Sequence, residues 1–338
     1  MRKLLNTLYI TKEDAYLKLD GETIICECNG ETLIKIPFDN VENIVCFSYL
    51  GCSPALMGKC VSKQVPINFV SPYGKFLAKI YGETKGNVFL RIQQIDKFRE
   101  NKIKLAQNTI AAKIGNCIQL IKRSMHDKSE LRNDEKVLRT IDYLNLAIDK
   151  IFKADSIEMI LGIEGNCAKE YFSIFNKLFS NNEFVFEHRS KHPPLDPINS
   201  VLSYLYTLAT MEFSSGLETV GLDSYIGYYH SLRSGRVSLA CDLVEEFRSI
   251  VERFVITLFN LKIFSDKDFD KQLSGAIFLN DNGRKKMLTH WQEKKRTVFM
   301  HPYLKEKIQF GLIPYIQGNL LAKYVRGDIE EYPSLLVK

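Results

Sequence analysis

A histidine and two carboxylates lie close together in the segment GLDSYIGYYHSLRSGRVSLACDLVEEFR (221–248), at His230, Asp242 and Glu245. Imidazole nitrogen and carboxylate oxygen together suit a divalent ion such as Mn²⁺ or Mg²⁺. On one unbroken helix, His230 and Glu245 would lie about 22 Å apart, too far to share an ion. We therefore expect the Ser-Gly-Arg break at 234–236 to fold the chain back. His230 would then end one helix, while Asp242 and Glu245 share a face of the next.

A further carboxylate for such an ion has to come from elsewhere, and Glu164 in LGIEGNCAKEYF (161–172) is the obvious donor. Two glycines flank it, and each costs about 1 kcal/mol of helix stability relative to alanine. That cost suggests a close approach of another backbone or a redirected side chain. Taken singly, each residue also has an ordinary explanation: an exposed glutamate at a kink, a buried histidine, a solvated acidic helix face. The combination of Glu164, His230 and Glu245 is more specific than any member.

Basic residues occur in two further places. Arg189 and Lys191 precede a Pro-rich turn in EHRSKHPPLDPINS (187–200). This is either an ordinary interhelical loop, with Asp196 as N-cap and Pro197 at the first helical position, or a phosphate contact. The basic segment 284–296, which contains Trp291, is either a solvated surface or a nucleic-acid contact with base stacking.

The length and composition of the 338-residue chain limit which kinds of protein it can be. Hydrophobic residues make up 45% and the formal net charge is +6, which permits two cores and a nucleic-acid partner without requiring one. No apolar run approaches the roughly 20 residues of a membrane span. The N-terminus does not resemble an export signal, no C-x-x-C pair occurs, and six of the eight cysteines lie in apolar surroundings. We expect a cytoplasmic protein with reduced thiols.

Hydrophobic periodicity divides the chain near Gly86-Asn87. Before this point short alternating runs and the turn dipeptides Asp20-Gly21 and Asn29-Gly30 indicate strands. The expected strands cover 7–10, 15–20, 22–28, 31–38, 40–49 and 65–82, with a short helix over 53–64. After it, apolar residues recur at helical spacing. The expected helices cover 88–125, 133–154, 156–179, 197–221 and 236–264. The prediction is an α+β protein: a small N-terminal β-domain (1–87) and a larger all-helical domain (88–338).

Four motifs in order resemble one family: GIEG (162–165), HRSKHPPLDPINSVLSYLY (188–206), GLDSYIGYYH (221–230) and SGRVSLACDLVEEFR (234–248). They are similar to those of the CRISPR adaptation integrases, endonucleases that insert new spacers into a CRISPR array. The resemblance spans nearly the whole chain. It implies that the N-terminal β-domain mediates homodimerisation and that the helical domain is catalytic and binds DNA.

The resemblance also implies roles for individual residues. The family's triad for Mn²⁺ or Mg²⁺ falls on Glu164, His230 and Glu245, and Asp242 matches a supporting acidic position. Arg236 and Arg248 match basic positions that would contact DNA phosphates, and Arg189 is a further candidate for this role. The implied reaction is attack of a protospacer 3′-OH on a phosphodiester at a repeat end. The implied partners are DNA, a second copy of the chain and a small ferredoxin-like adaptation protein.

Two other functions remain open from the sequence. A nuclease acting on branched DNA would keep the same triad and need no partner protein. A non-catalytic helical DNA-binding scaffold would keep the basic residues without any metal dependence, so Glu164→Ala would leave its DNA handling unchanged.

Overall fold

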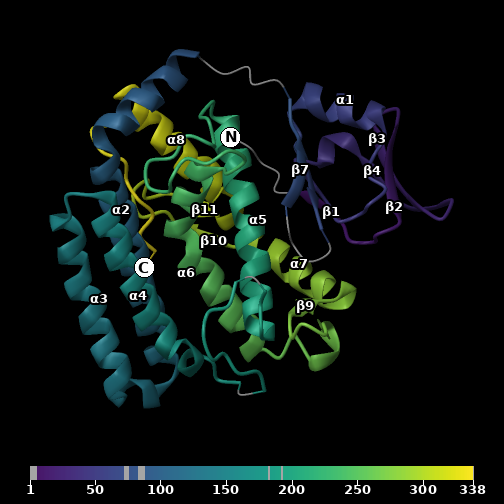
Figure 1. The fold of residues 1–338 in the computed structure, drawn as a ribbon. Coiled ribbons are helices and arrows are strands. Elements are labelled where there is room, and N and C mark those ends of the chain that lie inside the picture. The colour runs from purple at the N-terminus through teal and green to yellow at the C-terminus, as the bar shows by residue number, and fades with distance from the viewer. Residues whose placement is uncertain (1–5, 72–75, 83–87, 182, 192, 338) are drawn as a thin grey trace. The chain divides into compact units, whose positions relative to one another are not determined.

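The computed structural model describes residues 6–71, 76–82, 88–181, 183–191 and 193–337 (Figure 1). The chain divides into two compact units, the first of Met1–Lys85, Phe264–Val298 and Gln309–Leu312, the second of Gly86–Ile263, Phe299–Ile308 and Ile313–Lys338. The predicted fold class, β-structure followed by a mostly helical part, is confirmed. The boundary expected near Gly86-Asn87 lies outside the described residues. Residues 264–298, expected in the helical domain, group with the N-terminal unit.

The N-terminal part of the first unit, as far as Ile80, contains two β-sheets and the short helix α1 in its described residues. One sheet has the order β1-β5-β6-β7; β5 is parallel to β1 and β6, and β7 is antiparallel to β6. The other is the antiparallel meander β2-β3-β4. The elements are β1 (Thr7–Ile10), β2 (Ala15–Asp20), β3 (Thr23–Cys28), β4 (Glu31–Pro37), η1 (Phe38–Asn40), β5 (Asn43–Cys46), α1 (Pro54–Lys63), β6 (Ile67–Val70) and β7 (Phe76–Ile80).

The turn chemistry of the sequence explains the meander. Asn29 and Gly30 both have positive φ, 52° and 82°, the conformation that a tight two-residue hairpin turn needs. Asp20 pairs with Thr23 across the preceding turn. Both predicted hairpins are confirmed. The fully buried Leu17, Ile44 and Leu56 belong to the hydrophobic core that this unit forms.

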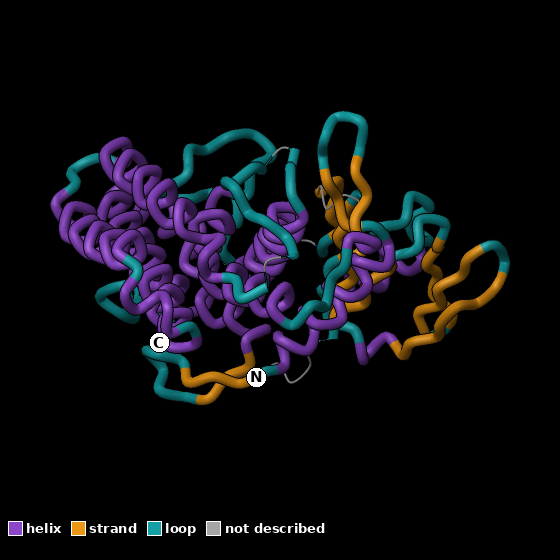
Figure 2. Tube along the Cα trace, turned by 90° about the horizontal axis from the view of Figure 1, so that it is seen from below, coloured by secondary structure: helices purple, strands orange, loops and turns teal. Residues whose placement is uncertain are grey.

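The second unit is a bundle of long helices, drawn purple in Figure 2, with teal loops between them. Helix α6 packs against α2 and α5, while α3 lies beside α2 and α4, and α8 lies beside α5. The elements are α2 (Val88–Asp127), η2 (Ser129–Asn133), α3 (Glu135–Lys153), α4 (Ile157–Ile174), η3 (Phe175–Leu178), α5 (Pro197–Thr219), α6 (Ser238–Asn260) and α8 (Ile313–Arg326). As predicted, the Asp196 carboxylate caps α5, accepting from the Asn199 amide at 2.7 Å, and Pro197 opens the helix.

The C-terminal part is not all helical, contrary to the prediction. Three-residue strands interrupt it, and Gly275, with φ of 83°, turns the chain between the first two of them in a conformation that a right-handed helix does not contain. The elements are η4 (Asp266–Asp268), β8 (Phe269–Lys271), β9 (Ile277–Leu279), α7 (Asp281–Arg296), β10 (Val298–Met300), β11 (Lys307–Gln309) and η5 (Phe310–Leu312). Strands β8 and β9 pair with each other, as do β10 and β11.

The basic segment 284–296 coincides with α7, and its charges are largely engaged within the first unit. Arg284 is 3% exposed and pairs with Asp281, and the Lys286 ammonium lies 2.7 Å from an Asp268 oxygen. Trp291 is 1% exposed. Base stacking by this tryptophan, one of the two interpretations of the segment, is therefore wrong for this structure.

All eight cysteines are free thiols, and six are buried, as their apolar surroundings predict. Within the part of the chain that the structure describes, none of the helices combines the length and the hydropathy of a membrane-spanning segment.

Candidate active site

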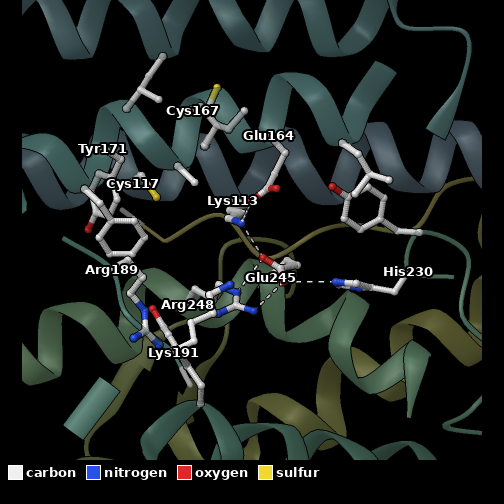
Figure 3. Close-up of a pocket in the computed structure, with 17 residues that line it drawn as sticks. Lys113, Cys117, Glu164, Cys167, Tyr171, Arg189, Lys191, His230, Glu245 and Arg248 are labelled. Carbon is white, nitrogen blue, oxygen red and sulfur yellow. Dashed lines mark hydrogen bonds and ion pairs between the residues drawn. The ribbon is translucent and has the colours of Figure 1, made fainter. Parts of the chain in front are cut away.

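A cavity in the second unit brings the predicted site residues together. Its walls come from α2, α3, α4, α5 and α6 and from the loops that precede α5 and α6. Figure 3 shows Glu164, His230 and Glu245 pointing toward the same region of this cavity. The charged and imidazole side chains that line it are Lys113, Glu164, Arg189, Lys191, His230, Glu245 and Arg248.

The loop between α5 and α6 holds His230 in place. The prediction that His230 ends a helix is wrong, because α5 ends at Thr219 and the chain remains non-helical to Val237. Gly221, with φ of 88°, turns the chain out of α5, and Gly235, with φ of 76°, lies near the return into α6. The expected fold-back is present, but it occupies the whole loop rather than the Ser-Gly-Arg stretch alone.

The buried carboxylate of Asp242 fastens this loop to α6. One oxygen accepts the backbone amides of Tyr228 and Tyr229 at 2.8 and 3.1 Å. The other accepts the amide and the ring Nδ1 of His230 at 2.9 and 2.7 Å. Because Nδ1 is bonded to a carboxylate, the second ring nitrogen, Nε2, is left as the metal- or substrate-facing atom. Asp242 thus orients the imidazole from behind rather than facing the cavity.

Close packing around Asp242 also explains one glycine of the loop. A Cβ added at Gly227 would lie 2.6 Å from the Asp242 Oδ2 and 2.9 Å from the Ser238 carbonyl carbon. No side chain fits there without moving the loop away from α6. Gly227 therefore allows the contact that positions His230.

Glu245 lies at the centre of the charged groups. Arg248 donates to both of its oxygens, from Nε at 2.8 Å and from Nη2 at 2.9 Å. The Lys113 ammonium from α2 lies 2.7 Å from the Glu245 Oε2 and also bonds the Glu164 Oε1. His230 Nε2 lies 3.9 Å from the Glu245 Oε1. A lysine thus bridges the two carboxylates that the sequence predicts as metal ligands.

These contacts shift proton affinities in the directions that opposite charges require. Burial by itself would raise the pKa of Glu245, but the charges of Arg248 and Lys113 outweigh it and hold the pKa far below its usual value. Burial would likewise lower the pKa of Lys113, but the charges of Glu245 and Glu164 raise it. Both groups are charged at neutral pH.

Two arginines of the cavity share one aromatic support. The guanidinium carbons of Arg248 and Arg189 lie 4.5 and 5.4 Å from the ring centre of Tyr206. The Tyr206 hydroxyl donates to the buried Glu252 at 2.7 Å, and Glu252 also accepts from Tyr171 at 2.9 Å. The buried carboxylate fixes the ring, and the ring limits where the two guanidinium groups can lie.

The structure separates the predicted residues into three groups. Glu164, His230, Glu245, Arg189 and Arg248 all line the cavity. Asp242 lies behind His230. Arg236 is half-exposed in the loop before α6 and is absent from the lining among the described residues.

Two expectations need correction. The glycines beside Glu164 suggest either a close approach of another backbone or a redirected side chain, and the first of these is wrong. An added Cβ at Gly162 or Gly165 meets nothing within 4 Å in the described structure, and α4 continues through both. The second concerns Lys113, which the sequence reasoning missed. The sequence feature that could have indicated Lys113 is its position as a single charged residue inside the mostly buried stretch TIAAKIGNC (109–117).

The donor set suits a divalent ion. Two carboxylates and an imidazole with its second nitrogen bonded to a carboxylate are ligands that Mn²⁺ or Mg²⁺ accepts. As the side chains stand, no group of three or more His, Cys, Asp or Glu residues in the described part of the chain is arranged to hold a metal. The Lys113 ammonium lies between the two glutamates instead. The ligand types fit an ion once Lys113 moves aside.

The arrangement as a whole suits phosphodiester chemistry. Four cationic side chains and two carboxylates face one cavity, so a negatively charged backbone meets net positive charge. The fold and the cavity together define a class of protein: a helical protein in which carboxylates and an imidazole lie beside basic side chains in one cavity.

Comparison with known proteins identifies the family within that class. Residues 8–293 match the family model described as CRISPR associated protein Cas1. The CRISPR-associated endonuclease Cas1 1 of Chlorobaculum tepidum is 39% identical over 342 residues, covering 99% of each chain. A protein of the same description from Moorella thermoacetica is 39% identical over 338 residues, covering 98% of each. The chain therefore belongs to the Cas1 family.

Solved structures share the fold. A Cas1 protein from Thermotoga maritima superposes with a TM-score of 0.81 at 24% identity, covering 95% of this chain and 97% of that one. A casposase bound to integration product gives a TM-score of 0.83 at 20% identity, covering 96% and 92%. At these identities the likeness concerns the fold alone.

Proposed function

We propose that this protein is a divalent-metal-dependent DNA endonuclease and integrase. In the proposed reaction, the 3′-OH of protospacer DNA attacks a phosphodiester at the end of a CRISPR repeat. A new P–O bond forms to the protospacer, and the P–O bond to the displaced DNA strand breaks, so that this strand leaves with a free 3′-OH. The observation that carries the proposal is the convergence of Glu164, His230 and Glu245 on one basic cavity in a chain of the Cas1 family. The names of its relatives, which are CRISPR-associated endonucleases, support the same activity.

The side chains of the cavity have two roles: some would hold the metal ion at the reacting phosphate, and others would bind the neighbouring DNA backbone. Glu164, His230 and Glu245 would hold Mn²⁺ or Mg²⁺. The chemistry that a bound ion supplies is neutralisation of the phosphate charge and activation of the attacking hydroxyl. Arg189 and Arg248, braced by Tyr206, hold the DNA backbone in register, so that the hydroxyl and the phosphorus meet in line.

The loop next to α6 keeps the imidazole ready for this role. Asp242 bonds Nδ1 of His230, so Nε2 is the ring nitrogen that would act as a ligand. Water in place of the 3′-OH would give hydrolysis at the same site, which accounts for nuclease and integrase activity in one protein. Arg236, half-exposed in the loop before α6, would contact DNA outside the cavity.

Insertion at both ends of a repeat requires two such sites at a set distance. An isologous dimer joined to a small ferredoxin-like adaptation protein would supply them. Structural neighbours that include a Cas6-RT-Cas1–Cas2 complex, with a TM-score of 0.82, are compatible with assembly of this kind. The N-terminal β-domain would hold the dimer. Among the described strands, β4 lies at the edge of its sheet, and Leu33 and Ile34 on it are 43% and 44% exposed.

The test is strand transfer of a protospacer duplex into a leader–repeat plasmid, with Mn²⁺ and the small partner protein present. Glu245→Ala and Glu164→Gln should lower product formation by about 100-fold or more, as removal of one stabilising group in a catalytic site does. Glu158→Gln is the matched control, because Glu158 is exposed on α4 and does not line the cavity in the described structure. Thermal melting of each variant establishes that it is folded.

The same assay separates the other functions. Cleavage of branched DNA by the wild type without partner, and no strand transfer with it, would favour a free-standing nuclease. DNA binding that is equal in wild type and Glu164→Gln, with no metal-dependent product from either, would favour a scaffold. Equal strand transfer by wild type and Glu245→Ala would remove Glu245 from the mechanism.

A further inference from the structure

The position of Lys113 is the least expected feature of the cavity. Its stem rises from the middle of α2 and its side chain is only 14% exposed. The ammonium bonds one oxygen of Glu164 and one of Glu245, which come from different helices, α4 and α6. A buried lysine held by two carboxylates has its charge compensated, and Lys113 in turn offsets part of the negative charge that the two glutamates bring into the cavity.

The donors around Glu245 show why an ion and Lys113 exclude each other. Its Oε2 accepts from both Lys113 and Arg248, and its Oε1 accepts from Arg248. A carboxylate has about four lone-pair directions, so little of Glu245 is left to coordinate an ion. Any cation that binds Glu164 and Glu245 together has to occupy the region between them, which the ammonium fills. Two cations at that distance would also repel each other.

The Lys113 ammonium can reach an alternative partner within the cavity. A lysine ammonium is a compact charge on a flexible four-carbon stem, so it can swing without moving its helix. The cavity that it lines also carries Arg189, Lys191 and Arg248, and a DNA phosphate bound there would give the ammonium a new partner.

We propose that Lys113 is a built-in substitute for the divalent ion. Without metal it pairs with Glu164 and Glu245, and when the ion takes the two carboxylates it moves to a phosphate of the DNA. This inference rests on the proposed metal dependence and adds its regulation. Because the ion binds at the expense of Lys113 and DNA accepts the released ammonium, metal and DNA tighten each other's binding, and to the same extent.

The first experiment measures metal binding without DNA. Free Mn²⁺ is quantified by electron paramagnetic resonance for wild type, Lys113→Met, Lys113→Gln and Lys113→Arg. The two neutral variants should bind Mn²⁺ about tenfold more tightly, because ~1.4 kcal/mol of competition is removed. Lys113→Arg keeps the charge and should bind as weakly as wild type. Lys191→Met is the control: Lys191 lines the same cavity, and the described structure shows no ion pair between it and either glutamate.

Thermal melting gives a readout that is independent of affinity. In EDTA, Lys113→Met should melt below wild type, because Glu164 and Glu245 face each other without a cation between them. Saturating Mn²⁺ should raise the melting temperature of this variant more than that of wild type, because the ion replaces the lost ammonium. Should Lys113→Met fail to fold in EDTA, Lys113→Gln retains a donor and carries the same comparison.

The outcomes distinguish this inference from the proposed function. If Glu245→Gln loses Mn²⁺ binding while the neutral Lys113 variants bind no more tightly than wild type, the metal site stands and the substitute role is overturned. If Mn²⁺ binding is the same in wild type, Glu245→Gln and the Lys113 variants, the ion binds elsewhere, and both the proposed metal site and the substitute role of Lys113 are refuted. Tighter binding in Lys113→Met and Lys113→Gln, but not in Lys113→Arg or Lys191→Met, supports the inference.

The coupling to DNA provides the last test. A duplex without a reactive 3′-OH should tighten Mn²⁺ binding in wild type, because it accepts the displaced ammonium. In Lys113→Met the same duplex should tighten it several-fold less. Equal tightening in the two proteins would overturn the movement of Lys113 to a phosphate.

Discussion

Asp242→Asn is expected to loosen the loop 220–237 and release the imidazole of His230, with almost no change in side-chain volume. The carboxylate is fully buried and accepts four N–H groups, two on each oxygen. Asparagine has one acceptor oxygen, so in either orientation its NH₂ group faces two of those donors. Each hydrogen bond to a charged group contributes about 1.5–3 kcal/mol, so losing two predicts a decrease of roughly 3–6 kcal/mol in the free energy of unfolding.

The assay is urea denaturation at neutral pH, followed by circular dichroism. Nitrogen NMR of the His230 ring supplies a local readout, because in the described structure the Asp242 carboxylate is the group bonded to Nδ1. Asp142→Asn is the matched control, since Asp142 is exposed on α3 of the same unit. Asp242→Asn should show a mixture of the two ring tautomers of His230 as well as a lower free energy of unfolding, and Asp142→Asn should show neither. A change in stability within about 0.5 kcal/mol, as for an ordinary surface substitution, and an unchanged tautomer would refute the reasoning.

Three further predictions follow from the same part of the structure. Gly227→Ala places a methyl group 2.6 Å from an Asp242 oxygen and should cost about 1–3 kcal/mol of stability by urea denaturation; wild-type stability would contradict the close approach. Burial raises the pKa of Glu246 from 4.5 to about 7, so the wild-type free energy of unfolding should fall as pH rises through that interval, by up to ~3 kcal/mol. Glu246→Gln should remove this slope in urea titrations at successive pH values, and an identical slope in both proteins would argue against it. Tyr206→Phe keeps the ring beneath the two arginines and removes one donor to Glu252, so it should lower stability by about 2 kcal/mol. DNA affinity, measured by fluorescence anisotropy, should stay near wild type, and a large loss would mean that the hydroxyl itself contributes to binding.

Local chemistry was enough to predict much of the fold. The Asn29-Gly30 turn, the strands that it joins and the Asp196-Pro197 start of α5 depend on backbone conformations and capping groups within a few residues. The spacing of apolar residues indicated the long helices, because this pattern too can be read within one segment of the chain. The short strands β8 to β11 were missed because three-residue elements carry no detectable period.

The sequence also indicated which residue types form the candidate site, but only the tertiary structure decided how they meet. Glu164 approaches Glu245 because α4 and α6 both pack against α2, a contact between helices that no local pattern encodes. The same packing places Lys113 between them, and it leaves Arg236 outside the cavity that Arg189 and Arg248 line. Asp242 and Glu245, three residues apart, looked alike in the sequence. Helix geometry turns one toward the backbone of the loop and the other into the cavity, and so one orients the histidine while the other faces it.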